Sequence, residues 1–521
     1  GPGRDETRHH CVGTRRGPVI YFLLVDRFLD GDPANNGAVD LADPQAFHGG
    51  DLAGVTAKLD YLRELGVDTL WLGPITQMRT EKFHGWGAYH GYWLDDPLAL
   101  EPRFGATPDL DALARGARAR GIGLVLDTVY NHVAPDHPLV SSHPQWFNHR
   151  GPITDWQDPD QLVRGEVHGL PDLDVDQPEV RDWLGRATDH WISVASPAAL
   201  RLDAVRHLPA AFVRTMGDRA RARGVPVWGE VFDGNVSNVV ARQREAALDA
   251  VFDYPLYYAL RDVVCGSAPV AQLAAVLDRG KALPGEAWIT FVDNHETPRV
   301  ASACGAGWEP EAAIELIFAL RGRPMITWGT EFLLAGADEP DNRADMRWAF
   351  DGQATDRVAW LRSLAERRRG SRALSRGSTR VVALGDDFAA WERQEGQERR
   401  WVVYNEGDGP VTVAGVTFDG RAVSVFDPGN IESPRLRAGW HRFASDVHLA
   451  PGDRLRVVGD APELGAWDPA RGIDVPGRVK LAAEAYTYKL VTLHADGRPP
   501  TWEGGANRWV VGAGRTLLAG R

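Results

Sequence analysis

Hydrophobic residues recur in two alternating patterns along residues 19–374. In residues 52–66, leucine and valine side chains are spaced three and four positions apart up to a glycine, which predicts an amphipathic helix ending there. Residues 67–73 are almost continuously apolar and predict a buried strand. Residues 107–132 repeat this order, with a proline near the helix start and a glycine after its end. Helices alternating with continuously apolar strands predict a parallel sheet covered on both faces.

Eight strands of this kind can be identified. They lie within residues 19–25, 68–73, 122–129, 198–205, 225–231, 248–254, 287–295 and 323–329. Eight strand and helix pairs predict a closed (β/α)8 barrel, an α/β fold, over residues 1–133 and 179–375. The stretch between the third and fourth strands is too long for one loop and one helix, so we expect residues 134–178 to form a small inserted domain.

The hydrophobic period changes to two after the barrel. Residues 376–433 alternate apolar and polar side chains between glycine and aspartate turns, which predicts an antiparallel β-sandwich. A proline-containing stretch then leads into a further all-β segment, residues 434–521. We therefore expect two all-β antiparallel domains behind the barrel.

Composition narrows the classes of partner. Asp and Glu total 71 against 58 Lys and Arg, a net charge of −13, which argues against nucleic acid and against an anionic membrane. No apolar run is long enough to span a membrane. The 19 tryptophans are unusual, and indole faces stack on sugar rings, so a neutral carbohydrate is the more natural partner. Cys11, Cys265 and Cys304 are far apart, which leaves one disulfide possible and supports no metal–thiolate site.

Acidic residues lie at the carboxyl ends of several of the predicted strands. They are Asp127, Asp203, Glu230 and Asp293. A single aspartate at a strand end commonly caps the next helix. Barrel active sites, however, lie at the carboxyl ends of the strands, and carboxylates that converge there raise one another's pKa, a cost that folding alone does not require. Paired carboxylates are the machinery of glycoside hydrolysis, one as nucleophile and one as proton donor.

Four segments at these strand ends resemble the signature regions of the α-amylase family, glycoside hydrolase family 13. They are DTVYNH (127–132), LRLDAVRH (200–207), GEVF (229–232) and FVDNHETPR (291–299). WLGPI (71–75), LPDLD (170–174) and PMITWGTE (324–331) resemble its three auxiliary regions.

The resemblance implies a role for three carboxylates. Asp203 would be the nucleophile, Glu230 the acid/base, and Asp293 the group that stabilises the distorted sugar. Arg201, two residues before Asp203, points the same way along the strand and would keep that carboxylate ionised. Glu230 must be protonated when substrate binds, so we expect a raised pKa for it. Retention of configuration predicts that the carboxyl groups of Asp203 and Glu230 lie about 5 Å apart.

The resemblance also implies sugar contacts and calcium. The contacts around the reacting sugar are His90, Tyr92, His132, Arg201, His295 and Arg343, and Glu339 replaces the aspartate usual before Arg343. One Ca2+ site would use Asn131, Asp172 and the backbone of His207. The second would use Asp30, Asp32, Asn35, Asn36, Gly49 and Asp51, since oxygen ligands in a tight turn suit Ca2+, although such a turn also forms without metal.

The last segment resembles a family 20 starch-binding module through VVGDAPELGAWDP, YTYKL and TWEGGANR. Trp467 and Trp502 would stack on glucose rings, and Lys489 and Asn507 would bond their hydroxyl groups. Tyr486 stands where a tryptophan is common, which leaves room for a weaker second site.

These features predict an α-amylase: retaining endo-hydrolysis of α-1,4-glucosidic bonds in starch, amylose and malto-oligosaccharides. One alternative is a cyclodextrin glucanotransferase or other 4-α-glucanotransferase, which Phe232 and the second calcium loop favour. His168, in place of a central aromatic residue, and the lack of an extra β domain argue against it. A non-catalytic glucan-binding protein is a further alternative. We expect a secreted monomer whose signal peptide has been removed, because the Gly-Pro-Gly start resembles a cleaved tag.

Overall fold

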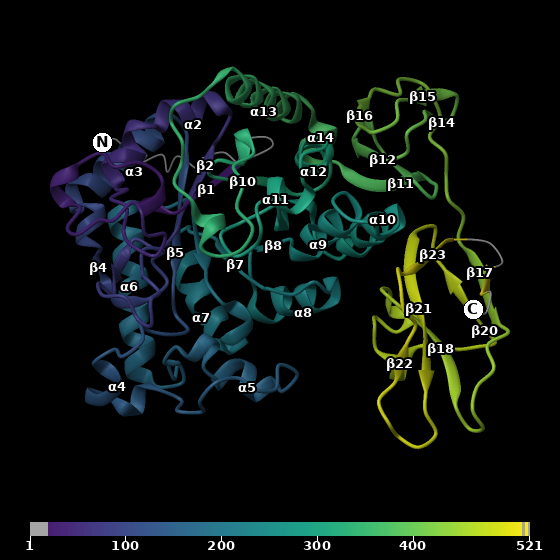
Figure 1. Cartoon of the computed structure of the whole chain (residues 1–521), viewed down its shortest axis with the longest axis horizontal. Helices are drawn as coiled ribbons and strands as arrows, with labels where there is room; N and C mark the ends of the chain where they lie inside the picture. The colour runs from purple at the N-terminus through teal and green to yellow at the C-terminus, as the bar shows by residue number, and fades with distance from the viewer. Residues whose placement is uncertain (1–18, 513–515, 519–521) are drawn as a thin grey trace, which may run out of the picture.

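The structure is a computed structural model that describes residues 19–512 and 516–518. Figure 1 shows a helix-rich body that contains the N-terminal part of the chain and a separate group of strands that contains the C-terminal part. Cys11 lies outside the described residues. No helix among the described residues is both long enough and apolar enough to cross a membrane.

Eight parallel strands close into a barrel, so the predicted fold class is confirmed. They are β1 (Ile20–Leu23), β2 (Thr69–Leu72), β5 (Gly123–Thr128), β6 (Ala199–Leu202), β7 (Val227–Gly229), β8 (Ala250–Phe252), β9 (Trp288–Phe291) and β10 (Arg323–Thr327). The sheet order follows the chain order, and β10 pairs with β1 to close it. Each strand lies within one of the eight predicted segments, because strands buried on both faces need continuous apolar runs.

Helices surround this barrel. They are α1 (Leu52–Ala57), α2 (Leu59–Leu65), α3 (Thr107–Ala119), α6 (Pro178–Ala195), α7 (Ala210–Arg221), α8 (Val236–Ala246), α9 (Tyr254–Val263), α10 (Val270–Arg279), α11 (Val300–Cys304), α12 (Glu309–Ala319), α13 (Gly352–Gly370) and α14 (Arg372–Arg376). The single helix predicted over 52–65 is wrong in one respect: it is broken at Lys58, whose φ and ψ of −106° and 7° are not helical. Gly66 ends α2 in the left-handed region, with φ of 96°, as its lack of a Cβ allows.

Between β5 and β6 the chain makes a long excursion with little regular structure. It contains the short helices α4 (Leu139–Ser142) and α5 (Pro159–Arg164). Isolated bridges pair His132 with Asp172 and Phe147 with Leu173, so the two ends of the excursion lie together at the carboxyl end of β5. A separate hairpin, β3 (Thr76–Met78) with β4 (Leu94–Leu100), follows β2.

The C-terminal part is built from β-sheets. The first group is β11 (Ser378–Leu384), β12 (Phe388–Glu395), β13 (Glu398–Asn405) and β16 (Ala422–Phe426), with the hairpin β14 (Val411–Val413) and β15 (Val416–Phe418). The second is β17 (Gly439–Ser445), β18 (Arg454–Gly459), β19 (Ile473–Asp474), β20 (Gly477–Leu481), β21 (Ala485–Leu493), β22 (Thr501–Trp502), β23 (Arg508–Val511) and β24 (Thr516–Leu518). Pairing is antiparallel except between β17 and β24. The limits assigned to the four domains stay predictions.

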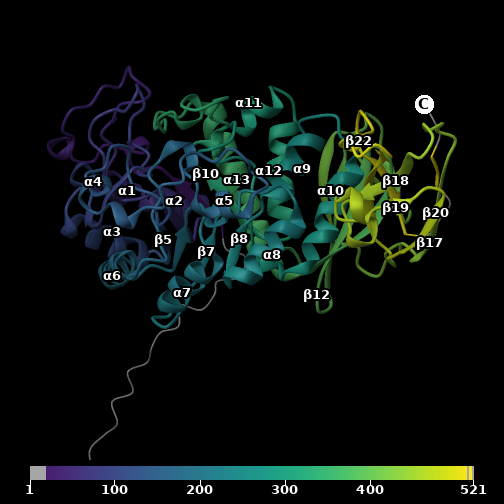
Figure 2. The same cartoon turned by 90° about the horizontal axis from the view of Figure 1, so that it is seen from below.

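The second group of strands packs directly on the barrel helix α10, and both views show the two side by side (Figures 1 and 2). The Asp278 carboxylate accepts a 2.8 Å hydrogen bond from the Ala485 backbone N–H. The Arg279 guanidinium lies 4.5 Å from the ring centre of Tyr486 and forms ion pairs with Asp460 and Glu484. Tyr486 is only 1% exposed, so it belongs to this interface, and the weaker second sugar site considered at this position is wrong.

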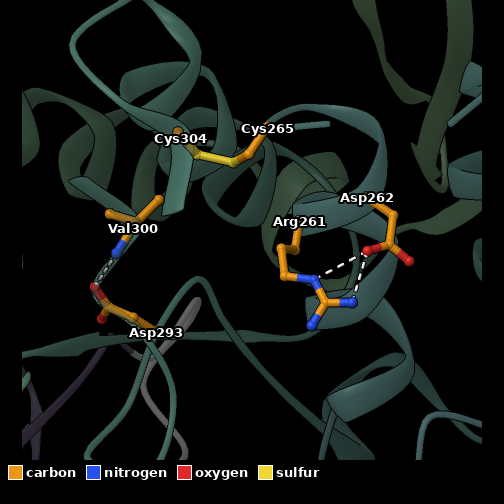
Figure 3. The surroundings of a disulfide bond; sticks show 6 residues. All are labelled: Arg261, Asp262, Cys265, Asp293, Val300 and Cys304. Carbon is orange, nitrogen blue, oxygen red and sulfur yellow. Dashed lines mark hydrogen bonds and ion pairs between the residues drawn. A yellow bond between two sulfur atoms is a disulfide. The ribbon is translucent and has the colours of Figure 1, made fainter. Parts of the chain in front are cut away.

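Cys265, which follows α9, and Cys304, which ends α11, form a disulfide (Figure 3). The bond closes a loop with a sequence separation of 39 residues. A closed loop of this length restricts the unfolded chain, so the loss of the bond is expected to lower the free energy of unfolding by about 4 kcal/mol. The double variant Cys265→Ser/Cys304→Ser should show this loss in urea unfolding followed by tryptophan fluorescence. Cys11→Ser is the matched control, and an equal loss in that variant would contradict the assignment.

Candidate active site

Arg201 lies at the centre of a group of carboxylates inside the barrel mouth. Its side chain is 1% exposed. Nη1 lies 2.9 Å from Asp127 Oδ1 and 2.6 Å from Asp203 Oδ1, and Nη2 lies 3.1 Å from Glu230 Oε1. The parallel register places Asp127 beside Arg201, and Asp203 and Glu230 follow directly after the ends of β6 and β7. One buried cation therefore orients acids from three neighbouring strands.

Both carboxylate oxygens of Asp127 accept hydrogen bonds from buried side chains. Its second oxygen accepts hydrogen bonds from the Tyr92 hydroxyl at 2.8 Å and from Trp71 Nε1 at 3.2 Å. Burial raises its pKa to about 6, although Arg201 and the hydrogen bond from Tyr92 lower it. With its oxygens bonded to Arg201, Tyr92 and Trp71, Asp127 serves to position Arg201.

The pKa values of Asp203 and Glu230 differ from the expected order. Burial and the charges of Glu230 and Asp127 raise the pKa of Asp203 to about 8, against the effect of Arg201. Burial also disfavours ionised Glu230, but Arg201, a hydrogen bond from Glu296 and the 2.9 Å bond from the Ala204 N–H bring its pKa below the usual value. Two expectations are therefore wrong for the free enzyme: Glu230 does not have a raised pKa, and Arg201 does not keep the pKa of Asp203 low.

Glu296 is the carboxyl group that carries the raised pKa beside Glu230, and the sequence analysis missed it. Its side chain hydrogen bonds to Glu230. Desolvation and the charges of Glu230 and Asp203 raise its pKa well above the usual value. Glu296 is therefore the donor and Glu230 the acceptor of the hydrogen bond between them.

Asp293 lies outside this group. It is 1% exposed, and its carboxylate accepts hydrogen bonds of 2.9 Å from the Val300 backbone N–H, drawn in Figure 3, and from the Thr330 hydroxyl. The predicted position of Asp293 beside the sugar is not what the structure shows. The alternation of side chains along a strand could have indicated this, because successive residues point to opposite faces. Asp203 and Glu230 come one residue after the ends of their strands, whereas Asp293 comes two residues after β9 and so points the other way.

The predicted sugar contacts gather on one side of Arg201. The Tyr92 ring stacks on His295 at 5.1 Å and on His90 at 5.8 Å. His132 Nε2 bonds to the Tyr92 carbonyl at 2.9 Å. Arg343 donates to the His295 carbonyl at 2.8 Å and pairs with Glu339 at 2.6 Å, so the longer Glu339 side chain still reaches the arginine.

The three histidines of this group are neutral. Burial lowers the pKa of His132 to about 4 and those of His90 and His295 well below the usual value. Among the described residues, the buried Nδ1 atoms of His132 and His295 have no hydrogen-bond partner. Unpaired nitrogens of neutral imidazoles can bond sugar hydroxyl groups without adding charge.

An exposed indole lies in the excursion between β5 and α6. Trp156 is 44% exposed and lies edge-on to the His207 ring at 5.8 Å. His207 follows the strand that carries Asp203. Trp156 was not predicted from the sequence, because its segment has no regular pattern.

The first predicted calcium site brings Asn131 and Asp172 together, since Leu173 N–H bonds to the Asn131 carbonyl at 2.9 Å. Asp172 Oδ2 accepts a 2.7 Å hydrogen bond from Asn148 Nδ2, but Asp172 Oδ1 is buried without a partner among the described residues. Burial raises its pKa to about 8. His207 bonds through Nδ1 to the Leu162 carbonyl at 2.9 Å. A buried oxygen without a partner fits an added cation.

The second predicted site divides into two parts. Asn36 Nδ2 donates to Asp30 Oδ2 at 2.6 Å, and a Cβ on Gly49 would lie 2.7 Å from that nitrogen, so this turn is tightly closed. The Oδ1 atoms of Asn35 and Asn36 are buried without a partner among the described residues and fit a cation.

Two acids of this set are already used by the backbone. Asp51 is buried and accepts from Gly31, Asp32 and Gly54 N–H groups, and Asp32 caps a short 3-10 helix by accepting from Ala34. Asp51 and Asp32 therefore stabilise the backbone of the loop that contains the predicted second site. Within residues 19–512 and 516–518, no group of three or more His, Cys, Asp and Glu side chains could hold a metal.

The predicted starch-binding residues lie together. Trp467 and Trp502 have ring centres 6.4 Å apart, and Trp502 is 40% exposed. Lys489 Nζ donates to the carbonyls of Glu503 at 3.0 Å and Gly505 at 2.6 Å, which shapes the turn after Trp502. Asn507 is half-buried next to this turn.

Comparison with known proteins agrees with this arrangement. The sequence matches the family description "Alpha amylase, catalytic domain" over residues 22–157 and 141–363, and "Starch binding domain" over residues 442–517. It is 29% identical over 418 residues to the β/α-amylase of Paenibacillus polymyxa, covering 74% of this chain and 33% of that protein. The chain therefore spans one third of that relative's length.

Two solved structures are similar over most of the chain. The α-amylase of Geobacillus thermoleovorans in complex with acarbose is 28% identical, with a TM-score of 0.68, covering 91% of this chain and 98% of that one. CldA, described as the first cyclomaltodextrin glucanotransferase with a three-domain ABC distribution, is 27% identical, with a TM-score of 0.73 and coverages of 80% and 100%. The chain thus belongs to the α-amylase family of glycoside hydrolases, family 13, whose members act on α-glucans, and it carries a starch-binding domain at its C-terminus.

Proposed function

We propose that the protein is a retaining endo-hydrolase of α-1,4-glucosidic bonds in starch, amylose and malto-oligosaccharides. The observation that carries the proposal is the bridge from Arg201 to Asp203 at 2.6 Å and to Glu230 at 3.1 Å. Both carboxyl groups contact one guanidinium at one end of the barrel, which supports the short separation expected for a retaining glycosidase.

In the first step Asp203 attacks the anomeric carbon, and the glucosidic bond breaks as Glu230 gives its proton to the leaving oxygen. In the second step Glu230 takes a proton from water, whose oxygen displaces Asp203 from the sugar. Glu230 needs a proton only when substrate is bound, and the hydrogen bond from Glu296 keeps that proton within the pair.

Glu296 is expected to matter for the rate, and Asp293 for the fold. Glu296→Gln should lower kcat on maltoheptaose by about 100-fold to 1,000-fold, because it removes the carboxyl group that exchanges a proton with Glu230. Asp293→Asn is the matched control: it should lower the free energy of unfolding by about 1–3 kcal/mol through its buried partners, with a smaller loss of kcat. Steady-state kinetics and thermal melts of both variants test this, and a larger kcat loss in Asp293→Asn would reverse the assignment.

We also propose two Ca2+ ions, held by Asn131, Asp172 and the His207 carbonyl, and by Asp30, Asn35, Asn36 and the Gly49 carbonyl. Ca2+ would neutralise buried oxygens and pin the excursion to the barrel. Removal by a chelator should lower the melting temperature, since ligand at 100 times its Kd stabilises a protein by about 2.7 kcal/mol. Scanning calorimetry with and without added Ca2+ measures the shift. Asp172→Asn should be less stable and respond less to Ca2+, whereas an unchanged response would remove the first site.

A glucanotransferase is the second candidate function. Phe232 supports it, because its ring lies 4.2 Å from that of Tyr254 beside Glu230, where it can bind an acceptor sugar. CldA is described as a transferase with a three-domain ABC distribution. The lack of an extra β domain in this chain is therefore no argument against transfer. Mass spectrometry of amylose digests distinguishes the two: hydrolysis gives linear oligomers of mixed length, and transfer gives cyclic or elongated products.

We further propose that the protein is secreted and acts as a monomer. The disulfide between Cys265 and Cys304 supports an oxidising compartment.

A further inference from the structure

The outer face of strands β17 and β20 carries an exposed tryptophan among basic side chains. Trp440 is 59% exposed, more than any other tryptophan among the described residues. The antiparallel register sets Trp440 opposite Lys480 and Arg442 opposite Arg478, so all four side chains lie on one face. Arg442, Arg478 and Lys480 are also exposed. The alternate residues of β17, His441 and Phe443, are buried on the other face. We call these four residues the basic aromatic face.

This face differs in charge from the rest of the protein. The chain has a net charge of −13, yet three cations gather here. In the part of the chain that the structure describes, none of the three forms an ion pair with a carboxylate, and the Arg478 guanidinium lies 5.0 Å from the Trp440 ring centre. Directly opposite side chains are about 5 Å apart and alternate positions along a strand are about 7 Å apart. One anionic group beside Trp440 can therefore reach two or three of the cations.

The predicted starch-binding residues have a different character. There Lys489 is held by two backbone carbonyls, and Arg508 pairs with Glu503 at 2.6 Å. The charges around Trp467 and Trp502 are thus already compensated, which suits the hydroxyl groups of a neutral glucan. The basic aromatic face has the same kind of aromatic platform but free positive charge.

We propose that the basic aromatic face binds α-glucan chains that carry phosphate monoesters. A glucose ring stacks on Trp440, and a phosphate on that ring or its neighbour is bound by Arg442, Arg478 and Lys480, with the guanidinium groups offering paired donors to its oxygens. Both views show β17 and β20 on the side of the strand group away from the barrel, so a large polysaccharide has access (Figures 1 and 2). The choice of an α-glucan rests on the proposed function.

The test compares binding of the full chain to amylopectin that carries phosphate monoesters and to the same amylopectin after phosphatase treatment, by depletion at low ionic strength. Exposed ion pairs each contribute little to binding, so we expect only about five-fold tighter binding to the phosphorylated sample. The triple variant Arg442→Gln/Arg478→Gln/Lys480→Gln should lose this preference and keep its affinity for the dephosphorylated sample. Salt should abolish the preference of the unaltered protein.

Two further variants separate stacking from charge. Trp440→Ala should weaken binding of the phosphorylated sample, and Trp502→Ala should weaken both samples equally and leave their ratio unchanged. Equal binding of the two samples by the unaltered protein, or a preference that survives in the triple variant, would overturn the proposal. So would sedimentation showing that the face instead pairs two copies of this chain.

The proposal can fail separately from the proposed function. Hydrolysis of maltoheptaose does not use this face, so the triple variant should keep the full rate and melting temperature. Absence of hydrolysis in the unaltered protein would instead reject the proposed function, whatever the binding result.

Discussion

Replacement of Asp203 with Asn is expected to lower kcat on amylose by at least about 10,000-fold. An amide does not attack the anomeric carbon, and the loss of a covalent nucleophile removes the whole two-step route. Steady-state kinetics on amylose and maltoheptaose measure the effect.

The Asp203→Asn variant should still fold and bind. Arg201 keeps its contacts with Asp127 and Glu230, so the positive charge stays paired. We expect a Kd for maltoheptaose within about ten-fold of the original, because the contacts that bind the substrate before the reaction are unchanged. A variant that folds, binds and keeps more than about one hundredth of kcat would mean that Asp203 is not the nucleophile.

Replacement of Glu230 with Gln is expected to lower kcat on amylose by about 100-fold to 10,000-fold, the range for loss of a general acid. The loss in the first step should be much smaller with α-maltosyl fluoride, because fluoride leaves without a proton. The second step still lacks its base, so a maltosyl ester should accumulate on Asp203. Mass spectrometry of the quenched variant measures this ester.

Azide provides the control for Glu230. As an anion it needs no general base, so it should restore turnover of the fluoride and give α-maltosyl azide. Tyr254→Phe is a matched variant, because its hydroxyl lies 3.3 Å from Glu230 Oε1 and it should show neither ester accumulation nor azide rescue. Azide rescue in Asp203→Asn instead would exchange the two assigned roles.

The barrel could be predicted from the sequence because its strands are buried on both faces and therefore mostly apolar, as in β1 and β9. Breaks within an element were less visible. Residues 52–65 have one helical spacing of leucines, but the non-helical backbone of Lys58 divides them into two helices. The spacing of apolar residues indicates which face of a helix is buried, but it does not indicate where the helix is broken.

The carboxylate group shows a similar limit. Convergence of Asp127, Asp203 and Glu230 follows from their places at neighbouring strand ends. The choice between Asp293 and Glu296 depends on the direction of each side chain beyond the end of β9, and the protonation order depends on distances to Arg201. Likewise Tyr486 resembles a sugar platform in sequence, but α10 covers it through a contact between distant segments. Such contacts have no local pattern.

The measurement that tests the central claim most directly is the anomeric configuration of the first products from amylose, followed by proton NMR before mutarotation. Double displacement through Asp203 predicts linear products that appear as the α-anomer and drift to equilibrium. Products that appear first as the β-anomer would show a single displacement by water and would contradict the assignment of Asp203 as nucleophile.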